Sequence, residues 1–117
     1  MNKFLIYPTI GLALLLPLGC SKEPSAHEGV NTLEQKFPNA AANPAIQLAI
    51  AAAKSNDLGQ GVVALQSAKH APGMTAEQLQ TVDQASQALT RELLRRAEAG
   101  DARAKADLDL IERSRSQ

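Results

Sequence analysis

Cys20 is the residue whose chemistry stands out, because it is the single cysteine of the 117-residue chain and lies just after an apolar run. Lys3 precedes that run, which covers residues 4–18 and is followed by Gly19. A positive charge, a short apolar segment and a small residue at its end are typical of a secretory signal peptide, and the run is shorter than the about 20 residues of a membrane-spanning helix. An exported thiol with no disulfide partner is a liability unless it is modified. The pattern therefore predicts export, with residues 1–19 as signal peptide and Cys20 covalently modified.

The segment Leu-Leu-Leu-Pro-Leu-Gly-Cys at residues 14–20 resembles the lipobox of bacterial lipoproteins. Gly19 matches the family's small residue before the cysteine, whereas Pro17 and Leu18 stand where the family usually has Leu and a small residue. The resemblance implies cleavage before Cys20, a diacylglycerol on its sulfur and a further acyl chain such as palmitate on its amine. Two or more such chains hold a protein stably to a bilayer. The alternative is an ordinary signal peptide cut near Gly19, which would leave a soluble protein with a free thiol.

The residue after the cysteine bears on sorting in the lipoprotein family. An Asp at that place tends to retain a protein in the inner membrane of Gram-negative cells, and this chain has Ser21 there. The resemblance therefore implies a lipid-anchored protein of the cell envelope, at the outer membrane and facing the periplasm if the cell is Gram-negative.

The other polar residues do not have the spacing of a catalytic or metal site. His27 and His70 have no second His or Cys at ligand spacing, so both are expected to face solvent. Asp107, Asp109 and Glu112 alternate with basic residues at four-residue steps, which favours an ion-paired helix face over acid–base catalysis. The sequence predicts a protein that is not an enzyme and has no metal or cofactor beyond the lipid on Cys20.

Charge and aromatic content narrow the choice of partners. Lys+Arg and Asp+Glu are equal at 12 each, so the chain offers nucleic acid no general attraction. Arg91, Arg95 and Arg96 form a basic cluster, which nearby Glu92 dilutes; a solvated face is expected, with contact to anionic lipid headgroups as the alternative. Phe37 is the single aromatic residue after the leader, and sites that stack bases or aromatic cofactors depend on such rings.

Residues 20–42 are expected to form the lipidated N-terminus and a flexible tether with a short helical turn. The polar stretch 21–29 has no hydrophobic period, which is typical of a linker. Asn31 and Glu34 then have the spacing of an N-cap and its returning glutamate. Phe37 is expected to fold back as an apolar plug on the domain, with an exposed partner anchor as the alternative.

Residues 43–117 predict a small all-α domain of about four antiparallel amphipathic helices. Asn43 is expected to cap the first helix, Thr75 with Gln78 forms a capping-box pattern, and Asp101 can cap the last helix. Apolar residues at three- and four-residue steps place the helices at 43–55, 58–69, 75–98 and 102–113. Short turns between them imply two helical hairpins.

Residues 45–68 resemble a tetratricopeptide unit, a helical hairpin in which small and large residues alternate so that two helices nest. Leu48 and Ala49 stand at the family's Leu-Gly pair, and Gly61 and Leu65 at its later small and bulky positions. The family's aromatic residues are missing. The resemblance implies either a TPR-like hairpin or a small bundle.

The expected function is a lipid-anchored, non-catalytic helical module that binds another envelope protein or a second copy of itself, because an alanine-rich core of this size gains little from burial alone. The alternative is a small-ligand carrier or an accessory enzyme subunit with a pocket between helices, although the polar groups are not expected to converge on one. The candidate partner-binding residues are Phe37, Ile46, Ile50, Leu65, Leu79, Leu89 and Leu93.

Overall fold

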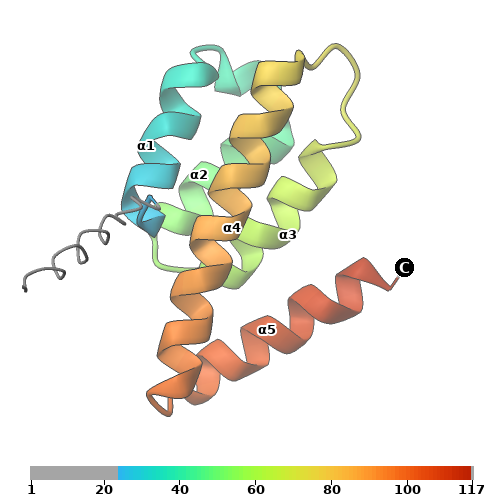
Figure 1. Ribbon diagram of the computed structural model, residues 1–117. Coiled ribbons are helices and arrows are strands. Elements are labelled where there is room, and N and C mark those ends of the chain that lie inside the picture. Colours follow the sequence, from blue (N-terminus) through green and yellow to red (C-terminus); the bar gives the residue numbers. More distant parts are fainter. Residues whose placement is uncertain (1–23, 117) are drawn as a thin grey trace, which may run out of the picture.

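Helices make up the fold of the chain, as its composition predicts. The computed structural model describes residues 24–116, and within that range it contains five α-helices, a 3-10 turn and no strand (Figure 1). The all-α prediction is confirmed, with one helix more than the four expected. The elements are α1 (Ala26–Lys36), η4 (Ala40–Ala42), α2 (Pro44–Lys54), α3 (Leu58–Ala68), α4 (Ala76–Glu98) and α5 (Ala102–Arg115).

The predicted caps are present at three helix starts. The Asn43 side chain accepts a hydrogen bond at the start of α2, and Thr75 and Gln78 form a complete capping box at the start of α4. Asp101 caps α5 by accepting hydrogen bonds from two backbone N–H groups. It follows Gly100, which lies just beyond the end of α4 and has a left-handed backbone conformation with a φ of 98°. Such side chains satisfy N–H groups that have no partner within the helix.

Helix α1 corrects the prediction of a tether that continues to Gly29. The helix is capped at Ser25, whose hydroxyl accepts from the backbone N–H of Glu28 while the Glu28 side chain accepts from the Ser25 N–H. Asn31 and Glu34, the predicted cap and its partner, lie inside the helix. Only residues 21–24 therefore separate Cys20 from Ser25, the N-cap of the first helix.

Gly29 allows α1 to lie close to α4. A Cβ atom at Gly29 would lie 3.3 Å from Cβ of Ala88 and 3.4 Å from Cα of Ala85. Val30 and Leu33 are buried from the same helix, so α1 belongs to the packed core. The helical body thus begins before residue 43, because the small side chains of Ala85 and Ala88 on α4 allow α1 to pack closely against that helix.

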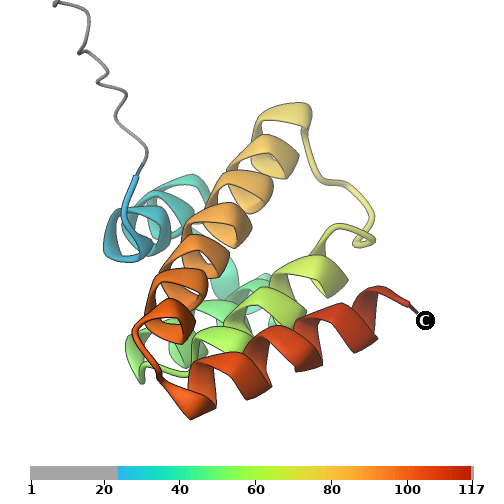
Figure 2. The same ribbon diagram turned by 60° about the horizontal axis from the view of Figure 1, so that its bottom comes forward.

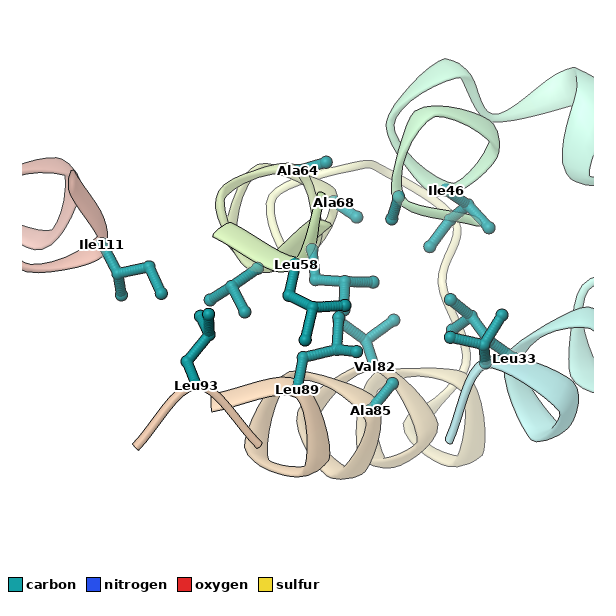
Figure 3. Packing of buried hydrophobic residues seen from close by; sticks show 14 of the residues in the cluster. Leu33, Ile46, Leu58, Ala64, Ala68, Val82, Ala85, Leu89, Leu93 and Ile111 are labelled. Carbon is teal, nitrogen blue, oxygen red and sulfur yellow. The ribbon is translucent and has the colours of Figure 1, made fainter. Parts of the chain in front are cut away.

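Helix α4 is the centre of the packing. It contacts α1, α3 and α5; Figure 1 shows α1 and α3 on its two sides, and Figure 2 shows α5 running beside α3. Figure 3 shows how the apolar side chains of these helices meet between the ribbons. The largest side chains with less than 2% exposure are Leu33, Ile46, Leu65, Leu89, Leu93, Val62 and Val82.

Candidate interaction surfaces

Most of the predicted partner-binding residues lie inside the protein. Ile46, Leu65, Leu89 and Leu93 are buried in the core, so a partner cannot reach them without opening the fold. This corrects their proposed role, because the periodicity that identifies an apolar helix face does not say which molecule covers it. Phe37 is buried as well, which agrees with the expected plug.

Ile50 and Leu79 are the two candidates that reach the surface. Ile50 is half-buried and packs against the core from α2, while Leu79 is 37% exposed on α4. Gln78, the neighbour of Leu79, is half-buried, and its side chain donates a hydrogen bond to the backbone carbonyl of Lys36.

A groove opens between the C-terminal end of α1 and the outer side of α2, and we call it the α1–α2 groove. Its volume is about 400 Å³. Apolar side chains form much of its lining, with polar side chains beside them. The lining residues are Phe37, Pro38, Ala40, Ile50 and Ala51, with Glu34, Gln47 and Lys54.

An ion pair joins the two helices beside this groove. Lys54 Nζ lies 2.7 Å from Glu34 Oε2, and both side chains are substantially exposed. An exposed pair of this kind contributes little to stability, on the order of 0–1 kcal/mol. It can therefore open or exchange partners at little cost when another molecule enters the α1–α2 groove.

A second depression, the α1–α4 cleft, lies at the other end of α1. Its volume is about 380 Å³, and polar side chains from α1, the α2–α3 turn and α4 line it. They include His27 and Asn31 from α1, Asn56 from the turn, and Glu92 and Arg96 from α4. The expectation that no polar groups would converge on a pocket is wrong, because α1 brings its polar first turn against α4.

Glu92 is the most perturbed acid in this cleft. Arg95 Nη2 lies 2.5 Å and Arg96 Nε 2.9 Å from Glu92 Oε2. Hydrogen bonds from Arg95, and then from Arg96, lower the pKa of Glu92 from 4.5 to about 2. The carboxylate therefore stays charged and partnered at any pH above that range.

The ion pairs of Glu92 predict a specific acid sensitivity. Because the folded pKa is depressed, the stabilisation is fully present above the unfolded value of 4.5 and is lost as pH falls toward about 2. Glu92→Gln is therefore expected to lose stability at neutral pH and to show a smaller fall in the free energy of unfolding between pH 5 and pH 2, measured by urea titration. Glu112→Gln is the control, because that exposed residue makes no ion pair within residues 24–116. Equal pH dependence of both variants would contradict the assignment.

The remaining polar candidates lie at the surface. Asp109 pairs with Arg113 across one helical turn at 3.0 Å, as the four-residue spacing predicts. Arg103 instead reaches Asp57 at the start of α3, at 3.4 Å. His70 is exposed beyond the end of α3. Within the part of the chain that the structure describes, no three His, Cys, Asp or Glu side chains are grouped as a metal site would need.

Comparison with known proteins returned no matching family model, no matching curated protein and no matching solved structure. The predicted signal peptide (residues 1–19) and Cys20, the predicted site of lipid attachment, lie outside residues 24–116. Among the helices of that range, none combines the length and the apolar character that crossing a bilayer requires.

Proposed function

We propose that this chain is a lipid-anchored envelope protein whose helical body binds another envelope protein in the α1–α2 groove. The observation that carries the proposal is that groove, which presents an apolar lining beside polar residues at the surface. The lipobox resemblance and the single cysteine support acylation of Cys20. In a Gram-negative cell, Ser21 favours the outer membrane with the helical body in the periplasm.

The groove suits an apolar side chain from a partner protein. Its volume of about 400 Å³ can hold one or two large side chains, and its lining from Phe37 and Ile50 is firmly held because both residues pack into the core. Partner residues buried in such preformed pockets supply most of the binding energy in many interfaces. Lys54 and Glu34 place a positive and a negative side chain at the edge of the groove, so a partner group of either charge can pair there.

We also infer that α2 and α3 form a TPR-like hairpin. The two helices pack against each other, and a Cβ atom at Gly61 of α3 would lie 3.6 Å from the carbonyl oxygen of Ala49 on α2. A small residue at each of these places is what the resemblance implies for two nested helices. The hairpin then serves as a rigid support for the α2 wall of the α1–α2 groove.

A charged substitution in the groove tests the binding proposal. Ala51 is exposed and lines the groove, so Ala51→Glu places a hydrated carboxylate on the binding surface without disturbing the core. We expect recovery of the partner with tagged, gently solubilised protein to fall at least about tenfold, as for loss of a central contact. Ala106→Glu, at another exposed alanine on α5, is the matched control.

Two results would overturn the proposal. Equal partner recovery by Ala51→Glu and Ala106→Glu would exclude the groove as the binding site. Repeated recovery of nothing but a second copy of this chain would replace hetero-association by self-assembly. Circular dichroism of both variants shows whether the helices are intact.

A second candidate function is that of a small-ligand carrier, with the ligand bound in the α1–α4 cleft. The convergence of Asn56, Glu92 and Arg96 favours it, since a few placed polar groups orient ligands in pockets of this size. A thermal-shift screen against lipids, haem and metal ions tests it. A large stabilisation that Arg96→Gln abolishes would support a carrier, and no shift with any of them would reject it for those ligands.

A further inference from the structure

The linker between Cys20 and the helical body is short. Residues 21–24 separate the cysteine from the N-cap Ser25, and a fully extended chain from Cys20 to Pro24 spans at most about 14 Å. If Cys20 carries lipid, its sulfur lies at the bilayer surface. Pro24 must then lie within about 14 Å of that surface as well.

The position of Pro24 determines which face of the helical body is held near the bilayer surface. The Arg91 guanidinium donates a hydrogen bond of 3.1 Å to the carbonyl oxygen of Pro24, so the chain enters the body beside the middle of α4. Figure 1 shows the first turn of α1 next to α4. The α1–α2 groove lies at the opposite end of α1, around Phe37.

The face of α4 around this entry combines basic and apolar side chains. Leu94 is 48% exposed, and Arg95 beside it exposes 69% of its side chain. Across a shallow depression from Arg91 lies Arg115 of α5. We call Arg91, Leu94, Arg95 and Arg115 the α4 basic face.

Acidic residues among residues 24–116 also lie near this face. Glu92 is bonded to Arg95 and Arg96 and is mostly covered. Glu98 lies one turn beyond Leu94, and Glu28 binds back to the Ser25 N–H at the start of α1. An exposed leucine between arginines is suited to a surface of anionic headgroups over acyl chains.

We infer that the α4 basic face rests on an anionic lipid surface, held there by the short linker. The inference rests on the proposed lipid anchor at Cys20. It places α4 toward the membrane and the α1–α2 groove, at the far end of α1, toward the partner. In this orientation Arg91 and Arg95 of the predicted basic cluster face the lipid headgroups, together with Arg115 of α5. Arg96, the third residue of that cluster, lines the α1–α4 cleft instead.

Depth-dependent quenching tests this orientation. Full-length protein purified from its membranes is reconstituted into vesicles of phosphatidylethanolamine and phosphatidylglycerol, with a fluorescent thiol label on Gln87→Cys or Gln47→Cys. Gln87 lines the depression of the α4 basic face, and Gln47 is the matched exposed glutamine on α2. Acylation blocks Cys20, so each variant takes a single label.

We expect spin-labelled lipid to quench most of the fluorescence at position 87 and little at position 47. The difference should shrink in vesicles of phosphatidylcholine alone, and in the variant Arg115→Glu. Equal quenching at both positions in vesicle-bound protein would overturn the orientation and leave the anchor intact. Protein that takes two labels and fails to float with the vesicles would overturn the anchor, and with it this inference.

Discussion

Leu89→Ala is expected to lower the free energy of unfolding by about 2–5 kcal/mol, the usual cost of removing a fully buried leucine side chain. Leu89 is 1% exposed, lies at the middle of α4, and its Cδ1 atom would be 3.1 Å from a Cβ on Gly61 of α3. The fold therefore has little room to close around the missing side chain. A small domain has only about 5–15 kcal/mol of stability, so a large part of it is lost.

Guanidinium unfolding followed by circular dichroism measures this effect. Leu94→Ala is the matched control, since the same residue type on the same helix is 48% exposed there. We expect the control to change stability by less than about 1 kcal/mol. Similar losses in the two variants would contradict the assignment of α4 as the helix that organises the core.

Replacement of Cys20 by alanine is expected to remove the protein from the membrane fraction altogether. The thiol is the proposed attachment point of the lipid, and without it no acyl chain remains to hold the helical body at the bilayer. The measurement combines fractionation with intact mass of the wild type and of Cys20→Ala. We expect an acyl mass increment in the wild type alone, after loss of residues 1–19.

An unmodified thiol in wild-type protein taken from its native membrane would contradict the anchor. Ser21→Ala serves as a control, because it leaves the cysteine in place and should retain both the added mass and the membrane association.

The helix starts could be predicted because capping is a local signal. Asn43, Thr75 and Asp101 each satisfy free backbone N–H groups at a fixed spacing, and that spacing is visible in the sequence. The first part of helix α1 was missed for the opposite reason, since the sequence predicts only a short helical turn from Asn31. The polar first turn and Gly29 suggest a linker, and only the Ser25–Glu28 capping box indicated that the helix begins earlier.

The candidate surfaces could not be predicted in the same way. Leu65 and Ile50 both continue apolar helix faces, yet one is fully buried and the other lines a groove. The α1–α2 groove exists because α1 packs on α4 and ends beside α2, and neither contact follows from the period of a single helix. The convergence of Glu92 and Asn56 on the α1–α4 cleft likewise depends on helix packing.

Photo-crosslinking in intact cells tests most directly whether the α1–α2 groove holds another envelope protein. A photoreactive benzoylphenylalanine replaces Ala51 in the groove or, as control, the exposed Ala106 on α5. We expect position 51 to yield one discrete product that contains a second envelope protein, and position 106 to yield no such product. The absence of that product at position 51, or the same product from both positions, would contradict binding in the groove.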